Sequence, residues 1–238
     1  MTRILPPSEP PSGPISEPLR EPSRRRRSAR ERLAGPDLSP TQGQGAVFFD
    51  RDGTLNEEIG HVRNAEDFRV YSFAARAVRL VNEAGLRAIV VTNQSGIGRG
   101  LIPESLVHRV NRQLTRRIAA GGGRLDAIYY CPHHPEASVE RFRVVCECRK
   151  PATGLLEAAA KEFGVDLARS FMIGDRFVDM LAGKRAGARS ILVLTGVGQR
   201  ELDDEKATGI QGITQPDHVA ENAYKAVRWI LANLQASQ

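Results

Sequence analysis

The sequence lacks any long apolar run. No stretch approaches the roughly 20 apolar residues that a membrane-spanning helix needs. The first thirty residues also lack the apolar centre of a signal peptide, because prolines and arginines stand there instead. We therefore expect a cytoplasmic protein that has no membrane partner.

Cysteine is scarce as well. The three cysteines all fall within residues 131–148, beside two histidines. An odd number of clustered cysteines in a chain without an export signal argues against a disulfide framework and favours a metal site.

The positive charge is modest and unevenly spread. The chain has 238 residues and a net charge of +6. Because 41% of the residues are hydrophobic, there are enough of them to form the core of one domain that carries a tail. Residues 1–45 hold eight arginines and five acidic residues and so supply +3 of that charge. The remaining +3 suits a small anionic substrate and does not demand a polyanion.

Residues 1–45 differ in composition from residues 46–238. They hold nine of the fourteen prolines and little apolar periodicity, so they cannot bury enough surface to offset the entropy of ordering. We expect a disordered tail followed by one folded domain. The arginine run at 24–27 suits nucleic-acid binding by counterion release, and a solvated tail without a specific partner explains it at least as well.

From residue 46 onward, short apolar segments alternate with longer amphipathic ones, which is typical of βαβ units in an α/β fold. The predicted strands are 47–49, 87–92, 125–130, 170–173 and 190–194, with a short strand near 217–220. Ser72 is expected to cap a helix that runs to residue 82 or 83, and Pro103 suits the first turn of a second helix. In the second helix, apolar residues recur every fourth position from Leu106 to Ile118. Two more helices are predicted at 154–163 and near 222–234.

Two acidic residues follow the first predicted strand. Asp50 and Asp52 come where Gly53 and Thr54 break the strand into a loop. In an open parallel sheet the ligand crevice lies beyond the carboxyl ends of the strands, so both carboxylates should lie at its mouth. Two nearby carboxylates favour a bound cation or a raised pKa. The alternative is a solvated turn, since Asp and Gly favour turns.

Polar residues also follow the second and fourth predicted strands. Thr92 and the following turn offer hydroxyl, amide and backbone donors for a phosphoryl oxygen, although an ordinary βα turn fits too. Asp175 follows the fourth strand and is the expected Mg²⁺ ligand there, because Mg²⁺ prefers oxygen ligands. Asp179 is either a further metal contact or a residue that orients the next helix.

The cysteine-rich segment predicts a closed zinc site. Cys131, Cys146 and Cys148 supply three thiolates, and His133 completes a tetrahedral set, with His134 as the second choice. A closed set should brace the loop and not activate water. The alternative is three unligated cysteines in a surface loop.

Two cations, Arg149 and Lys150, follow the last cysteine directly. A loop braced by metal would hold them in place, as a phosphate clamp requires. Lys150 would neutralise a transferring phosphoryl group, and Arg149 could grip another part of the substrate through its planar fork. An exposed basic pair is the alternative.

Five motifs occur together in an order that resembles one family. They are DRDGTLN (50–56), VVTNQSGIGRG (90–100), YYCPHHP (129–135), CECRKP (146–151) and MIGDRFVDM (172–180). Over about residues 46–235 the chain resembles the haloacid-dehalogenase-like phosphohydrolases, in the branch of the heptose bisphosphate phosphatases. The resemblance implies a single Rossmann-like domain, with helices on both faces of a parallel sheet and a zinc-braced loop.

The resemblance also implies roles for individual residues. Asp50 would be the nucleophile, and Asp52 would protonate the leaving alkoxide and then activate water. Asp50, Asp175 and the backbone carbonyl of Asp52 would bind Mg²⁺, while Thr92 and Lys150 would steady the phosphoryl group. The zinc ligands would be Cys131, His133, Cys146 and Cys148. The substrate-facing residues would be Asn93, Gln94, Ser95, Arg149, Arg176 and His61.

Four positions depart from the family pattern. His61 stands where a Tyr is usual, and Glu58 and Ile59 replace a commoner Asp-His pair. Arg176 replaces a frequent Lys, which changes the donor geometry and keeps the charge. The changes within residues 58–61 concern the edge of the site that would face the sugar. The tail rich in proline and arginine has no counterpart in the family.

By this resemblance the chain is a Mg²⁺-dependent phosphatase that acts at C7 of a heptose bisphosphate, through an aspartyl-phosphate, on the route to nucleotide-activated heptose. We expect a monomer with a small sugar phosphate as its partner. Two alternatives stay open. Histidinol-phosphate phosphatases share the motifs and the zinc loop, and a nucleic-acid-associated protein, such as a polynucleotide 3′-phosphatase, would use the arginine-rich tail.

Overall fold

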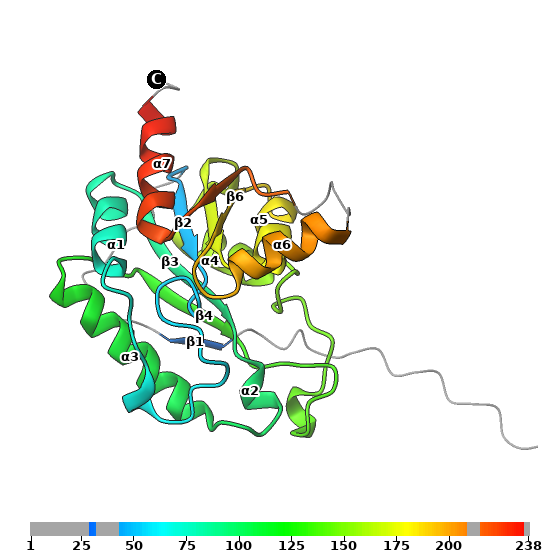
Figure 1. Cartoon of the computed structure of the whole chain (residues 1–238). Coiled ribbons are helices and arrows are strands. Elements are labelled where there is room, and N and C mark those ends of the chain that lie inside the picture. The colour runs from blue at the N-terminus through cyan, green and yellow to red at the C-terminus, as the bar shows by residue number, and fades with distance from the viewer. Residues whose placement is uncertain (1–28, 32–42, 209–214, 236–238) are drawn as a thin grey trace, which may run out of the picture.

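A seven-stranded sheet runs through the molecule (Figure 1). The computed structural model describes residues 29–31, 43–208 and 215–235. The strands follow the order β1-β4-β3-β2-β5-β6-β7; β2 to β7 run parallel, and β1 pairs with β4 in the antiparallel sense. The strands are β1 (Ala29–Glu31), β2 (Ala46–Phe49), β3 (Arg87–Asn93), β4 (Ala127–Cys131), β5 (Phe171–Gly174), β6 (Arg189–Val193) and β7 (His218–Ala220).

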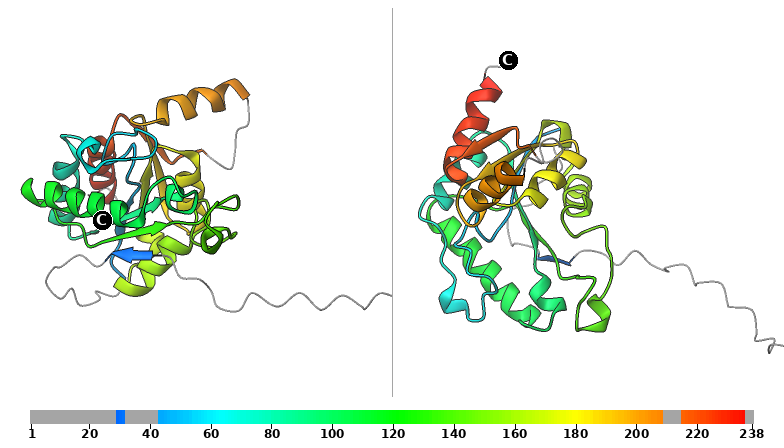
Figure 2. Two further views of the ribbon diagram at one scale, coloured as in Figure 1. Left: turned by 90° about the horizontal axis from the view of Figure 1, so that it is seen from below. Right: turned by 45° about the vertical axis from the view of Figure 1, so that its right-hand side comes forward.

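Helices cover both faces of the sheet, as the alternating pattern predicted (Figure 1). They are α1 (Ala74–Glu83), α2 (Ser95–Gly98), α3 (Glu104–Ala120), α4 (Gly154–Phe163), α5 (Phe177–Arg185), α6 (Gly198–Thr208) and α7 (Ala223–Gln235). Val47 and Phe49 pack into one core with α1, α3 and α7, whereas Phe48 packs with α4 into the other. In the left view of Figure 2, α6 extends outward from the body of the domain.

Strand β2 lies at the centre of the sheet, between β3 and β5. All four of its residues are buried, because a central parallel strand is covered on both faces. The chain leaves β2 toward β3 on one side and returns to β5 on the other, so the strand order switches at β2. Ligands of open α/β sheets bind at such a switch point, beyond the carboxyl ends of the strands.

The predicted helices are found with small shifts at their ends. The apolar stripe of α3 is confirmed, since Leu106, Val110, Leu114 and Ile118 are all buried. The predicted cap at Ser72 is wrong by one residue, since Phe73 is the N-cap of α1. A backbone hydrogen bond from Ala74 N to Tyr71 O closes a turn there, and the helix begins after that turn.

The tail prediction differs from the structure at β1. Residues 29–31 lie within the segment that we expected to be disordered, yet they pair with Ile128, Tyr129 and Tyr130 of β4. The physical reason is that β4 would otherwise leave the backbone groups of its outer edge without partners, and any extended segment can satisfy them. Most of the predicted tail, including the arginine run at 24–27, lies outside the described residues.

Across the described ranges, no helix combines the length and the apolar character that crossing a membrane requires.

Candidate active site

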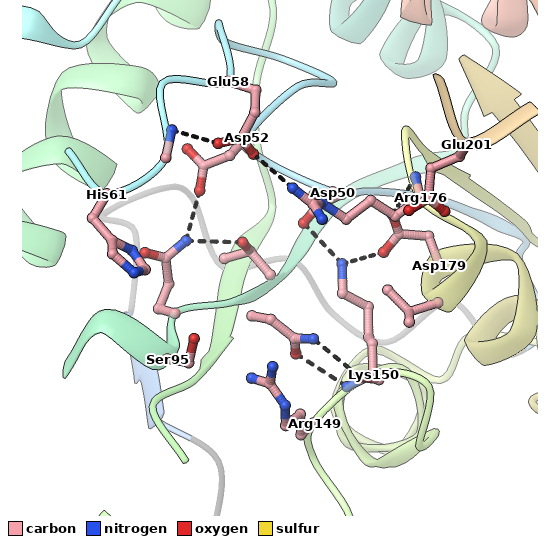
Figure 3. Close-up of a pocket in the computed structure, with 15 residues that line it drawn as sticks. Asp50, Asp52, Glu58, His61, Ser95, Arg149, Lys150, Arg176, Asp179 and Glu201 are labelled. Carbon is pink, nitrogen blue, oxygen red and sulfur yellow. Dashed lines mark hydrogen bonds and ion pairs between the residues drawn. The ribbon is translucent and has the colours of Figure 1, made fainter. Parts of the chain in front are cut away.

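A cavity of about 330 Å³ opens beyond the carboxyl ends of β2 and β3, beside the start of α5 (Figure 3). All ten residues predicted to be catalytic or substrate-facing line it. Those ten are Asp50, Asp52, His61, Thr92, Asn93, Gln94, Ser95, Arg149, Lys150 and Arg176. Glu58, which departs from the family pattern at the sugar-facing edge, also lines the cavity, as does Glu201, to which no sequence pattern pointed. Asp175 is fully buried and is not a lining residue.

Lys150 joins two carboxylates at the floor of the cavity (Figure 3). Its Nζ lies 2.8 Å from Asp50 Oδ1 and 2.6 Å from Asp179 Oδ1, and it donates a third bond of 2.8 Å to the carbonyl oxygen of Val91. Burial alone would lower the pKa of Lys150, but the charges of Asp179 and Asp50 outweigh it and raise that pKa. The lysine is therefore a fixed cation next to Asp50.

Asn93 holds the backbone of Lys150 in place. Its Nδ2 donates to the carbonyl oxygen of Lys150, and its Oδ1 accepts from the Lys150 N–H, both at 3.0 Å. The resemblance assigned Asn93 to sugar recognition. In the structure both ends of its side-chain amide are instead hydrogen-bonded to the backbone of Lys150.

Three carboxylates gather beneath the cavity. Oxygen atoms of Asp50, Asp175 and Asp179 all lie within 4.8 Å of one another. Oδ1 of Asp175 is buried and has no hydrogen-bond partner among the described residues, whereas Oδ2 accepts from the N–H of Val197 at 2.9 Å. An unpartnered buried oxygen among like charges is the environment in which a bound cation replaces missing contacts. These residues therefore fit a hard divalent cation.

Electrostatics within this group are unfavourable without a cation. Burial, and then the charges of Asp50 and Asp179, raise the pKa of Asp175 to about 8. Burial raises the pKa of Asp179 to about 6, against the lowering effect of Lys150. Asp179 also accepts from the backbone N–H of Arg176 at 3.2 Å and so caps α5. The position of Asp179 thus matches both interpretations that the sequence left open, a further metal contact and a residue that orients the next helix.

The Asp52 carboxylate is surrounded by nitrogen donors. Asn56 Nδ2 reaches its Oδ1 at 2.9 Å, Gln94 Nε2 reaches its Oδ2 at 2.8 Å, and the guanidinium of Arg51 forms a two-pronged contact with both oxygens. Burial raises the pKa of Asp52, but the charge and hydrogen bonds of Arg51, with Asn56 and Gln94, lower it overall. Sequence reasoning missed Arg51, although its place between the two aspartates was a signal.

Thr92 and Gln94 connect this carboxylate to the end of β3. Thr92 is buried, and its Oγ1 accepts a hydrogen bond of 3.1 Å from Gln94 Nε2. Ser95 begins α2, and the ring of His61 packs close to Gly96 in the same helix. Hydroxyl, amide and imidazole groups therefore form one wall of the cavity (Figure 3).

Charged residues of both signs form the rim. Arg176 Nη2 lies 3.5 Å from Glu58 Oε2, and Glu201 accepts from the N–H of Phe177 at 2.6 Å. Arg149 donates to the carbonyl oxygen of His133 at 3.3 Å. Burial raises the pKa of Glu58, which lies in the segment that departs from the family pattern.

The four predicted metal-binding residues of the cysteine-rich segment come together. The Sγ atoms of Cys131, Cys146 and Cys148 lie 3.3–3.5 Å apart, and His133 Nδ1 lies 3.3 Å from Cys148 Sγ. His134 lies outside this group, since it is only partly buried and its Nε2 faces Arg99. The donor set of three sulfurs and one imidazole could hold a metal ion.

Comparisons with known proteins agree on one family. A HAD-hydrolase-like family model matches residues 147–226. The chain is 40% identical over 193 residues to a D-glycero-D-manno-heptose-1,7-bisphosphate 7-phosphatase from Thermosynechococcus vestitus, a match that covers 79% of this chain and 96% of the relative. It is 42% identical over 152 residues to the D-glycero-beta-D-manno-heptose-1,7-bisphosphate 7-phosphatase of Escherichia coli K12, covering 63% and 80% of the two chains.

A solved structure is similar as well. The D,D-heptose 1,7-bisphosphate phosphatase from B. bronchiseptica, complexed with magnesium and phosphate, superimposes with a TM-score of 0.69 at 28% identity. That match covers 80% of this chain and 99% of the other.

Proposed function

The chain belongs to the D-glycero-D-manno-heptose-1,7-bisphosphate 7-phosphatase family of HAD-like hydrolases, and from this premise we propose that it removes the C7 phosphate of heptose 1,7-bisphosphate. The observation that carries the proposal is the cluster of Asp50, Lys150 and Asp175 at the switch point of the sheet. The product would be a heptose 1-phosphate, on the route to nucleotide-activated heptose.

In the proposed mechanism Asp50 attacks the phosphorus atom of the C7 phosphate. The bond from phosphorus to the sugar oxygen breaks as an aspartyl-phosphate forms, and Asp52 gives a proton to the leaving oxygen. Asp52 would gain that proton when the phosphate dianion binds beside it, because a nearby negative charge opposes the lowering of its pKa by Arg51. The Asp52 carboxylate then takes a proton from water while that water attacks the phosphorus. This second step releases inorganic phosphate and restores both aspartates.

Cations balance the charge that accumulates during the reaction. Lys150 stands beside Asp50 and would contact the transferring phosphoryl oxygens, and Thr92 would donate a hydrogen bond to them. Asp50, Asp175 and the backbone carbonyl of Asp52 would hold Mg²⁺, which offsets the charge of the phosphate and the carboxylates. The unpartnered Oδ1 of Asp175 supports this assignment.

The cysteine-rich segment would bind zinc through Cys131, His133, Cys146 and Cys148. Zinc accepts thiolate and imidazole ligands in a closed tetrahedral set, which leaves no position for water. Its role would be to fix the loop that delivers Arg149 and Lys150 to the cavity. The compact arrangement of the four donors supports this role.

The far end of the substrate would lie near Arg149, Arg176 and His61. A bisphosphate carries a second dianion, which needs cationic contacts away from the reacting phosphate. The two arginines line the same cavity as Lys150 and can supply them. The engaged amide of Asn93 supports a different role for that residue, namely to position Lys150.

Phosphate release from three substrates tests the proposed activity. The α and β anomers of heptose 1,7-bisphosphate and histidinol phosphate would be compared at equal concentrations with Mg²⁺. We expect efficient release of one phosphate from a heptose bisphosphate and little from histidinol phosphate, which lacks the second dianion. Preference for histidinol phosphate would keep the phosphatase chemistry and overturn the proposed substrate.

A further inference from the structure

Arg51 is a buried cation that the mechanism above does not use. Its side chain is 2% exposed and does not line the cavity. Nε and Nη2 contact Oδ1 of Asp52 at 3.2 and 3.1 Å, and Nη2 contacts Oδ2 at 2.8 Å. The guanidinium also lies 5.8 Å from the centre of the Phe68 ring. A bidentate contact of this kind fixes both the position and the rotation of the Asp52 carboxylate.

The third nitrogen of Arg51 is anchored to α3. Nη1 donates a hydrogen bond of 2.9 Å to Oδ1 of Asn111, sixty residues away in the chain. Asn111 is fully buried on the apolar side of α3, next to Val110 and one turn from Leu114. Its Nδ2 has no hydrogen-bond partner among the described residues, so its side-chain amide is used only to accept from Arg51.

A buried amide with one unsatisfied group costs stability, and an apolar residue would fit the same face of α3 better. A role of Asn111 in function would explain why the chain keeps this destabilising residue. Among the described residues, the only hydrogen bond of the Asn111 side chain is the one that it accepts from Arg51. That bond holds Arg51, and Arg51 in turn orients the Asp52 carboxylate.

We propose that Arg51 and Asn111 are positioning residues that tie the Asp52 carboxylate to helix α3 and hold it in the orientation required for proton transfer. The proposal rests on the proposed phosphatase function. Asn56 and Gln94 donate hydrogen bonds to the same carboxylate from other directions. Gln94 also donates to Thr92. Arg51 and Asn111 therefore act from behind the carboxylate, away from the substrate.

The chemistry of Asp52 gives a readout that a purely structural role would not move. A sugar alkoxide is a poor leaving group and needs the proton of Asp52 as the bond to phosphorus breaks. A p-nitrophenolate leaves without that proton, so formation of the aspartyl-phosphate from p-nitrophenyl phosphate does not depend on Asp52. Breakdown of the aspartyl-phosphate still does, since Asp52 must take a proton from the attacking water.

The test compares Asn111→Leu, Asn111→Asp and Arg51→Lys with wild type. Leucine removes the acceptor for Arg51, whereas aspartate keeps an oxygen there. For Asn111→Leu we expect kcat on heptose bisphosphate to fall about tenfold to a hundredfold, a part of the roughly 10²–10⁴ that a positioned acid or base contributes, with KM within about threefold. With p-nitrophenyl phosphate we expect a burst of p-nitrophenol near one per enzyme, followed by slow turnover. Asn111→Asp should restore kcat to within about threefold of wild type.

Arg87→Lys is the matched control. Arg87 is a buried arginine that pairs with Asp126 at 3.2 Å, at the opposite end of β3 from the cavity. Its substitution should lower the melting temperature and leave kcat, KM and the time course of p-nitrophenol release as in wild type.

Three results decide the outcome. Unchanged kcat in folded Asn111→Leu, or a loss without a burst that Asn111→Asp fails to restore, would overturn the positioning role. A wild-type protein that releases phosphate from none of these esters would overturn the proposed function itself. If Arg51→Lys does not fold, the Asn111 pair of variants still decides the question.

Discussion

The ammonium of Lys150 lies 2.8 Å from Oδ1 of Asp50, although one hundred residues separate them in the chain. Cys148, a member of the cysteine cluster, precedes Lys150 by two residues, and Asn93 holds the backbone of Lys150 from β3. The position of the cation therefore depends on the sheet and on the cysteine-rich loop together.

Replacing Lys150 should harm both activity and stability. Lys150→Gln leaves Asp50 and Asp179 buried without their cation, and breaking a buried ion pair typically costs about 3–5 kcal/mol. We expect a clear fall in melting temperature, part of which Mg²⁺ restores. Phosphate release should fall by about 10²-fold or more, as for other charge-stabilising groups. Turnover within a few-fold of wild type would show that Lys150 does not contact the phosphoryl group.

The Asn93→Ala variant separates two roles for that residue. If Asn93 positions Lys150, kcat should fall by up to about thirtyfold while KM changes little, since two hydrogen bonds of about 1 kcal/mol each are lost. A large rise in KM at constant kcat would instead indicate that Asn93 binds the sugar.

Asn82 offers a matched control for Asn93. It pairs in the same two-way manner with the backbone of Arg124, at 3.1 and 2.7 Å, outside the cavity. Asn82→Ala should therefore affect the melting temperature and leave both kinetic constants unchanged.

Binding of Mg²⁺ should depend on pH through Asp175. Its pKa is raised from 3.8 to about 8 without a metal, so the unfolded chain ionises this carboxyl first. Stability from this group is therefore lost as the pH rises from about 4 to about 8 in metal-free protein. Mg²⁺ binds the ionised form, so its stabilising effect should be larger at pH 8.5 than at pH 6. Thermal melts with and without Mg²⁺ at the two pH values measure this.

Asp175→Asn is the variant for the same experiment. It removes the repulsion from Asp50 and Asp179, so metal-free protein at pH 8.5 should be more stable than wild type and should gain little from Mg²⁺. A Mg²⁺ effect equal to that of wild type would contradict the assignment of Asp175 as a ligand.

Zinc should bind at one ion per chain, and Cys146→Ser should lower that content. Loss of the ion loosens the loop that carries Lys150, so both the melting temperature and kcat should fall, and metal analysis with kinetics measures each. His134→Ala is the control, because that partly buried histidine lies beside the cluster without joining it. Full activity of a zinc-free protein would show that the ion does not brace the site.

Local patterns predicted much of the fold and the site. The apolar strands β2 and β3 and the four-residue spacing in α3 are visible in short windows of sequence. Several residues of the cavity were also predictable, since Asp50, Asp52 and Thr92 lie at strand ends and Lys150 follows a cysteine, and parallel strands bring their carboxyl ends to one edge. His61 follows no such point, and only the family resemblance indicated it.

Contacts between distant segments were not predictable in this way. Strand β1 depends on the open edge of β4, which no local pattern in residues 29–31 records. The bond from Arg51 to Asn111 likewise joins segments sixty residues apart. One signal for it existed: with Val107, Val110 and Leu114, Asn111 shares the buried stripe of α3, where an amide is out of place.

The central claim is that Asp50 carries the phosphoryl group from C7 of a heptose bisphosphate. Phosphorus NMR of the 1,7-bisphosphate with Mg²⁺ and either wild type or Asp50→Asn tests it directly, after thermal melts show that both proteins are folded. We expect wild type to remove the C7 phosphate and leave the C1 phosphate in place, and Asp50→Asn to remove neither. Turnover by a folded Asp50→Asn at a rate near that of wild type would contradict the claim, as would loss of the C1 phosphate in its place.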